Sequence, residues 1–333
     1  MLGRVPAPLN FGFFRHWKFI IRQSTTNPKL ELRHHPGILS RMKLAALTLA
    51  ALCAALPLHA AAMLRALIVD GQNNHDYKST TPHLKKVLEE TGLFTVEVAT
   101  APGKGADNSS FKPQFKSYRV IISNYNGEPW SQETQNALVA YVRGGGGFVS
   151  VHAADNSFPN WKEYNEMIAV GGWEGRNEKS GPYLRLRAGK WTQDTTAGAG
   201  GHHGQQHPFV MDTRVPAHPI MAGLPAQWMH AKDELYDRLR GPAQNVTVLA
   251  SAMSAEETGG SGEHEPLLMV ISFGRGRVFH TALGHNNGPD ITAQKCVGFI
   301  TTLQRGTEWA ATGKVTQKVP ADFPTADKVS LRE

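Results

Sequence analysis

Cysteine is scarce in this 333-residue sequence, which contains two, Cys53 and Cys296. Cys53 lies in a segment with the character of a secretion signal, so we expect the processed chain to keep only Cys296. No intramolecular disulfide is then available to the fold. Cys296 itself lies in an apolar, helical stretch, where a buried core position is more typical than a reactive nucleophile.

Motifs for nucleotides and for serine nucleophiles are also missing. The sequence has no P-loop, and "GQNNHDY" (71–77) after the first predicted strand is not a GxGxxG loop that wraps a pyrophosphate. It has no GxSxG elbow either, and Ser150 lies inside an apolar strand, where it is a poor nucleophile. We therefore expect no nucleotide cofactor and no serine-hydrolase chemistry.

The excess of positive charge is confined to the N-terminal region. The formal net charge is +7, but residues 1–62 hold eight Lys and Arg residues against one acidic residue. Removing these from the totals of 35 basic and 28 acidic residues leaves 27 of each. The remaining chain is formally neutral, which gives no electrostatic case for a nucleic-acid partner.

Residues 42–62 have the pattern of a signal peptide. Arg41 and Lys43 flank Met42, the apolar stretch 44–58 is too short to span a bilayer, and small residues follow at 59–62. We expect Met42 to be the start of the signal and 1–41 an upstream extension. The predicted protein is periplasmic or secreted, without stable membrane insertion after cleavage; an N-terminal membrane anchor is the alternative.

Residues 63–312 have the pattern of one α/β domain, followed by an irregular tail at 313–333. A helix is expected to start with Thr81 as its N-cap and Pro82 as its first residue, and a second helix with Ser131 as its N-cap. A weakly periodic insertion, 171–235, is long enough to be functional. Strands are predicted at 64–70, 94–100, 119–125, 147–152, 246–252, 266–273 and 276–283, with a closing helix at 291–311. Near-continuous apolar strands that alternate with helices predict a doubly wound, mainly parallel sheet.

Histidines gather where such a sheet binds its ligands. His75, His152 and His285 fall at or just after the carboxyl ends of apolar strands, so they converge if those strands are neighbours. In "HHGQQH", His203 and His207 would share one face of a helix, which the nearby glycine and proline weaken. Neutral imidazole suits Zn²⁺ and similar divalent ions. The metal-ligand candidates are thus His75, His152, His203, His207 and His285.

Carboxylates near these histidines are candidates for proton transfer. Asp155 closely follows His152, and Glu234 lies beside Asp233 in "DELYD". Each could act as a ligand or as a general acid or base with a histidine. The alternatives are an ion pair with a nearby arginine for Glu234 and a purely structural role for His152. The catalytic candidates are His152, Asp155 and Glu234.

Several segments together resemble the ThuA-like (trehalose utilisation) family over residues 64–312. They are "ALIVDGQNNHDYKSTTPHLKKVLEETGLFTVEVA", "GGGGFVSVHAAD", "DELYD" and "GRVFHTALGHN", with "FITTLQRGTEWA" near the end. The resemblance implies a flavodoxin-like three-layer α/β sandwich, the fold of class I glutamine amidotransferases. Those enzymes carry a cysteine after the strand that corresponds to 147–152. His152 and Ala153 stand in that neighbourhood here, so cysteine-dependent amidotransferase activity does not carry over.

The resemblance implies a role in carbohydrate metabolism, on trehalose-like or 3-keto sugars. Combined with the histidines, it predicts a metal-assisted enzyme, with hydrolase, lyase and isomerase chemistry left open. A non-catalytic sugar-binding or accessory protein is the main alternative, and an oligomeric partner of a sugar dehydrogenase is another. The expected partner is a small sugar, and a homo-oligomer is compatible with the sequence.

Overall fold

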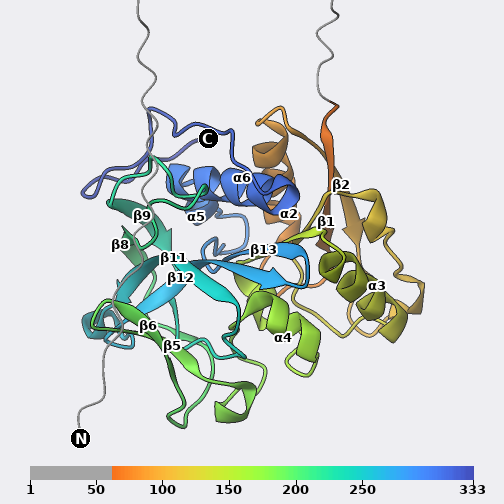
Figure 1. The fold of residues 1–333 in the computed structure, drawn as a ribbon, viewed down its shortest axis with the longest axis horizontal. Coiled ribbons are helices and arrows are strands. Elements are labelled where there is room, and N and C mark those ends of the chain that lie inside the picture. Colours follow the sequence, from red (N-terminus) through yellow and green to blue (C-terminus); the bar gives the residue numbers. More distant parts are fainter. Residues whose placement is uncertain (1–61) are drawn as a thin grey trace, which may run out of the picture. The chain divides into compact units, whose positions relative to one another are not determined.

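A nine-stranded sheet organises residues 62–333, the part of the chain that the computed structural model describes (Figure 1). The strand order is β2-β1-β3-β4-β13-β12-β11-β8-β9. The predicted upstream extension and the signal segment up to residue 61 lie outside the described residues. Among the described helices, none is both long and apolar enough to cross a membrane.

One half of the sheet is parallel and matches the predicted strands closely. It consists of β1 (Leu64–Asp70), β2 (Phe94–Thr100), β3 (Val120–Ser123), β4 (Gly147–Val151) and β13 (Gly276–Thr281). Every residue of β3 and β4 is buried, which explains why these segments are almost continuously apolar. Because parallel strands run the same way, their carboxyl ends meet along one edge of the sheet.

The other half of the sheet is antiparallel, so the expectation of a mainly parallel sheet needs correction. β12 (Glu263–Phe273), β11 (Val246–Ser254), β8 (His207–Thr213) and β9 (Gln227–Asp233) follow β13 in antiparallel order. The physical reason is connection length: the two residues between β12 and β13 can close a hairpin but cannot make a parallel crossover. The predicted α/β architecture is confirmed, with a mixed central sheet.

Helices cover both faces of the sheet and make a three-layer sandwich (Figure 1). α2 (Tyr77–Glu89), α5 (Thr292–Lys295) and α6 (Val297–Thr312) lie on one face, where α2 packs on β1 and β2 and α6 packs on β4 and β13. α3 (Gln132–Arg143) and α4 (Lys162–Ile168) lie on the other face. The predicted N-cap of α3 is confirmed, since the Ser131 side chain accepts the Thr134 N–H.

Two helix boundaries differ from the prediction. α2 begins at Tyr77 rather than after Thr81, because the Asp76 side chain accepts the Lys78 N–H and caps the helix earlier. The closing helix is split at Cys296, whose extended backbone forms a bridge with Leu331 of the tail. The tail is otherwise irregular, as expected, and its pairing with Cys296 accounts for the break.

The long insertion contains short strands rather than only loops. β5 (Tyr183–Arg187) and β6 (Lys190–Asp194) form a hairpin, and β7 (His202–His203) pairs with β10 (Tyr236–Asp237). A helix spanning His203 and His207 does not form, since β7 contains the first and β8 begins at the second. Gly204 and Pro208, which disfavour a helix, follow the two histidines.

Candidate metal centre

Three histidines lie along the carboxyl edge of the parallel strands. His75 is in the loop after β1, His152 directly follows β4, and His285 is in the loop after β13. β4 pairs with both β3 and β13, and β3 pairs with β1, so these ends are close neighbours in the sheet. The convergence expected from the sequence is therefore present in the fold.

Glu234, just after β9, completes a cluster with these histidines. His75, His152, Glu234 and His285 each offer one ligand atom, and these atoms all lie within 4.8 Å of one another. Glu234 Oε2 lies 3.1 Å from His285 Nδ1 and 3.8 Å from His152 Nε2. Two bonds of about 2.0–2.2 Å to one ion allow such separations. We refer to these four residues as the His₃Glu cluster.

Two ring nitrogens of the cluster are buried without a hydrogen-bond partner. The His152 Nδ1–H donates to the Ala282 carbonyl at 2.8 Å, which leaves the lone pair on Nε2. His152 Nε2 and His285 Nδ1 are both buried and unpaired, and both face Glu234. Buried polar atoms in native proteins nearly always have a partner. The donor set and the two unpaired nitrogens fit a divalent metal ion at this position.

The backbone of His152 has a left-handed conformation, with φ of 47°. A residue with a Cβ atom pays roughly 1–2 kcal/mol for this conformation, whereas glycine adopts it freely. The strained residue lies at the junction between β4 and a short 3₁₀ segment, His152–Asn156. Such local strain concentrates at functional sites.

This strain gives a testable difference between two variants at one position. We expect His152→Gly to be more stable than His152→Ala by about 1 kcal/mol, although both lose the same imidazole. Urea unfolding of the two proteins measures the difference in free energy of unfolding. An alanine variant at least as stable as the glycine variant would show that this backbone conformation carries no strain.

Burial and neighbouring groups shift the pKa values of the cluster residues, and most of the shifts favour the neutral imidazoles and the ionised carboxylate. Burial lowers the pKa of His75 to about 3, with help from His152 and His285, and burial also lowers the pKa of His152. Burial opposes ionisation of Glu234, but the close approach of the His285 ring and the other nearby imidazoles outweigh it and lower the pKa of Glu234 to about 2. Burial disfavours a charged His285, but the adjacent Glu234 carboxylate and Asn287 outweigh it and raise the pKa of His285.

A second buried carboxylate, Asp233, ties together the segments that carry Glu234 and His285. Its Oδ1 accepts the backbone N–H of Glu234 at 2.7 Å and of His285 at 3.0 Å. Its Oδ2 accepts the Gly284 N–H at 2.8 Å and lies 2.7 Å from His230 Nε2. Gly284 has φ of 116°, and a Cβ there would meet the Phe299 ring at 2.9 Å. Asp233 thereby fixes the spacing between two members of the cluster.

His230 and Cys296 lie behind this carboxylate, away from the cavity. Burial opposes protonation of His230, but Cys296 and Asp233 outweigh it and raise the pKa of His230 to about 10. A protonated His230 donates its Nε2–H to Asp233 and keeps that carboxylate ionised in the interior. From the sequence, Asp233 could be a ligand, an acid–base partner of a histidine, or a structural residue at a solvated loop edge or in an ion pair with a nearby arginine. Its four donors could not be predicted from residue spacing.

The other candidate residues lie at different distances from the cluster. His203 lines the same cavity, and its Nε2 lies 3.4 Å from Glu234 Oε1. His207 is not among the four; its Nδ1 lies 2.7 Å from the Pro208 carbonyl. Asp155 is fully buried outside the cluster, with Oδ2 at 3.2 Å from His280 Nε2. The structure thus joins four of the seven candidates into one cluster and leaves His203 beside it.

The cluster opens into a small cavity of about 200 Å³. Trp173 and Tyr236 form part of its wall, and the Tyr236 ring stacks on His152 with centroids 4.3 Å apart. The strand pair β7–β10 places Tyr236 and His203 opposite each other at this position. The cavity therefore combines acid–base groups with an aromatic surface.

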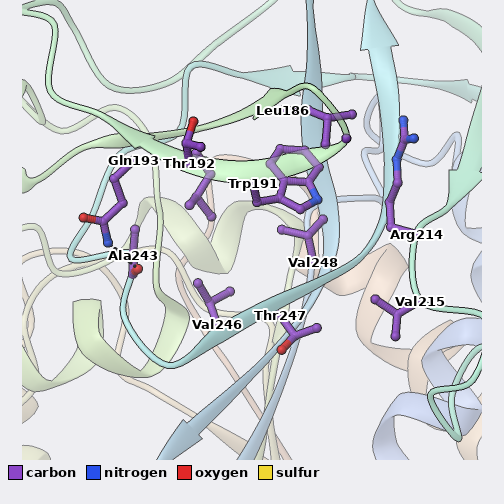
Figure 2. A pocket seen from close by; sticks show the side chains of 12 residues that line it. Leu186, Trp191, Thr192, Gln193, Arg214, Val215, Ala243, Val246, Thr247 and Val248 are labelled. Carbon is purple, nitrogen blue, oxygen red and sulfur yellow. Dashed lines mark hydrogen bonds between the residues drawn. The ribbon is translucent and has the colours of Figure 1, made fainter. Parts of the chain in front are cut away.

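A separate pocket of about 450 Å³ lies between the β5–β6 hairpin and the β8–β11 region (Figure 2). Trp191 and Leu186 on the hairpin lie above Val246 and Val248. Of its lining residues, Arg214 alone is charged, and that side chain is bonded to Ser251 and Asp212. This pocket has none of the groups that bind metals or transfer protons.

Comparisons with known proteins agree with this architecture. The sequence profile of ThuA, described as trehalose utilisation, matches residues 65–310. The crystal structure of a ThuA-like protein from Parabacteroides merdae is 48% identical, with a TM-score of 0.80, covering 81% of this chain and 98% of that one. A ThuA-like protein from Bacteroides uniformis shares the fold at 19% identity and a TM-score of 0.51, covering 78% and 97%. A comparison with proteins of curated function finds no match.

Proposed function

The chain belongs to the ThuA family of trehalose utilisation, and from that premise we propose that it is a secreted, metal-assisted enzyme of sugar metabolism. Its substrate is a sugar or a 3-keto-sugar derivative. The observation that carries the proposal is the His₃Glu cluster, in which two buried ring nitrogens face one ionised carboxylate without any hydrogen-bond partner.

His75, His152, Glu234 and His285 would hold the ion. A divalent metal supplies Lewis-acid polarisation of a sugar oxygen or lowers the pKa of a water molecule. His152 is held in the ligating tautomer by the Ala282 carbonyl. His285 Nε2 lies 3.0 Å from Asn287 Oδ1, which can accept a proton from it, and 2.9 Å from the Gln206 amide nitrogen, which can donate to it.

His203 is the group we assign to proton transfer. Its Nδ1–H donates to the Gly204 carbonyl at 2.8 Å, so its Nε2 carries the lone pair. That nitrogen lies at the wall of the cavity, 3.4 Å from Glu234 Oε1, on a side chain that is 35% exposed. It can accept a proton from a sugar hydroxyl or from water at the cavity mouth. Asp155 is fully buried and paired with His280, outside the cluster and its cavity, so we assign it no proton transfer.

Metal content and turnover together test the proposal. Purified protein should contain about one divalent ion per chain and should convert a 3-keto-glucoside, and a chelator should remove both properties. A protein that binds no Zn²⁺ and leaves the keto-sugar unchanged contradicts the proposal. Sugar affinity that survives chelation, without product, would instead support the non-catalytic binding protein.

The pKa values predict how metal affinity depends on pH. His75 and His152 have lowered pKa values and Glu234 is ionised, so His285 is the cluster histidine that must lose a proton before it ligates. Zn²⁺ affinity should fall about tenfold per pH unit below the pKa of His285 and level off above it. Calorimetry at pH 6 in two buffers of different ionisation enthalpy should show release of one proton. Affinity that does not change between pH 5 and 7 would contradict this assignment.

A further inference from the structure

Two carboxamide side chains meet at one ring nitrogen of His285. Gln206 Nε2 lies 2.9 Å from His285 Nε2, and Asn287 Oδ1 lies 3.0 Å from the same atom. The other ring nitrogen, Nδ1, lies 3.1 Å from Glu234 Oε2. The nitrogen of His285 that faces the cluster and the nitrogen that meets the two amides are therefore different atoms of one ring.

The two amides also hold each other in place. Asn287 Nδ2 donates to Gln206 Oε1 at 2.9 Å, and Gln206 Nε2 donates to Asn287 Oδ1 at 3.3 Å. Their backbones are fixed separately, because Asn287 exchanges hydrogen bonds with Asp290 and the Gln205 N–H donates to the Thr258 carbonyl. The two side chains, which we call the amide pair, thus present one donor and one acceptor to His285 Nε2.

A neutral imidazole satisfies one member of the amide pair at a time. With the lone pair on Nε2, His285 accepts from Gln206, and its Nδ1 carries the proton and cannot ligate. With the proton on Nε2, His285 donates to Asn287, and its Nδ1 has the lone pair that binds an ion. Gln206 therefore favours the form that does not ligate, and Asn287 favours the ligating form.

The Glu234 carboxylate acts in the same direction as Gln206 in the metal-free protein. A proton on His285 Nδ1 lies next to Glu234 Oε2, so this anion stabilises the form that does not ligate. When His285 ligates through Nδ1, its remaining proton lies on Nε2 and Asn287 accepts it. Gln206 Nε2 then retains a second acceptor, Glu234 Oε1, at 3.3 Å. Both forms of the ring are thus served without movement of the backbone.

We propose that Gln206 and Asn287 are positioning residues that set the tautomer of His285 and so change the affinity of the His₃Glu cluster for a divalent cation in opposite directions. This inference rests on the proposed function in that it takes the cluster to be a metal site. It adds two residues outside the cluster and the sign of the effect of each. Only molecules in the ligating tautomer bind the ion, so the apparent affinity follows their fraction.

Zn²⁺ titration of two alanine variants tests the opposite signs. Asn287→Ala removes the acceptor of the ligating form and should bind Zn²⁺ about tenfold more weakly than the wild type. Gln206→Ala removes the donor to the other form and should bind it about threefold more tightly. Asn287 is exposed and Gln206 is partly exposed, so both variants should fold. Asn136→Ala is the matched control, since Asn136 is an exposed asparagine that pairs with Gln132 on α3.

Nitrogen NMR of the metal-free protein, with ¹⁵N-labelled histidine, measures the tautomer itself. The signal of His285 is assigned from its loss in His285→Gln. At alkaline pH the wild-type signal should show the proton on Nδ1, and Gln206→Ala should shift it toward Nε2. Asn287→Ala should leave the proton on Nδ1. A purely structural role of the two amides would not change this signal.

The outcomes separate this inference from the proposed function. Equal losses of Zn²⁺ affinity in Gln206→Ala and Asn287→Ala, or a His285 tautomer that does not change in Gln206→Ala, overturn the inference and leave the cluster as a metal site. A wild-type protein that binds no Zn²⁺ overturns both proposals before any variant is compared. Opposite changes in Zn²⁺ affinity, together with the tautomer shift in Gln206→Ala, support both.

Discussion

Replacing Glu234 by glutamine is expected to weaken Zn²⁺ binding by about 100-fold or more. Glu234 is the anionic member of the His₃Glu cluster and lies within reach of two of its ring nitrogens, His152 Nε2 and His285 Nδ1. The substitution keeps the shape of the side chain but removes its charge, so a cation loses its main electrostatic partner. Loss of groups that merely support metal ligands already costs about 10–100-fold in affinity.

Competition with a fluorescent chelator measures this change in the otherwise unmodified protein. Glu90→Gln is the matched control, because Glu90 is an exposed residue of the α2 end that pairs only loosely with Lys86. The control should bind Zn²⁺ as the wild type does, and both variants should unfold at similar urea concentrations. If Glu234→Gln keeps its Zn²⁺ affinity within threefold of the wild type, the cluster is not the metal site.

Asp233→Asn is expected to lower the free energy of unfolding by about 3–5 kcal/mol. The native carboxylate faces donors on every side: the Nε2–H of His230 and the backbone N–H groups of Glu234, Gly284 and His285. An asparagine turns an NH₂ group toward at least one of these donors and leaves the buried, protonated His230 without its counter-charge. Breaking a buried pair by removal of one partner typically costs this much.

Two measurements distinguish the positioning role from general destabilisation. Urea unfolding gives the loss of stability, and Zn²⁺ titration under folding conditions should show weaker binding, because Glu234 and His285 lose their common anchor. Asp107→Asn, an exposed aspartate that bonds only to Ser109, should change neither quantity by much. A stability within 1 kcal/mol of the wild type, with unchanged Zn²⁺ affinity, would contradict the assigned role of Asp233.

The parallel part of the fold was predictable because its strands are short, apolar and separated by well-marked helices. Segments 64–70 and 94–100 became β1 and β2 with the same bounds. The antiparallel half was harder, because hydrophobic runs that are buried on both faces do not report strand direction. The break at Cys296 depends on pairing with Leu331, a contact between distant segments that local sequence does not encode.

The candidate site was predictable where position in the sheet decides it. His75, His152 and His285 follow strands whose carboxyl ends share an edge, so topology alone brings them together. His207 was selected because it lies four residues after His203. Residues at this spacing share a face only in a helix, and the two histidines lie in strands.

The contacts that orient the cluster residues could not be predicted from the sequence either. Asp233 precedes Glu234 directly, yet its bonds reach His230 in β9 and the backbone after β13. The donors that stabilise this buried carboxylate come from segments that meet only in the folded protein. The same applies to the unpaired nitrogens of His152 and His285, which are defined by what surrounds them rather than by residue type.

Anomalous diffraction at the zinc edge, from crystals of the Zn²⁺-loaded protein, would locate the metal ion itself. We expect one strong peak within about 2.0–2.2 Å of ring nitrogens of His75, His152 and His285 and of a Glu234 oxygen. A protein that takes up no zinc, or a peak held by other residues such as His202 or His207 with none at the cluster, would contradict this expectation.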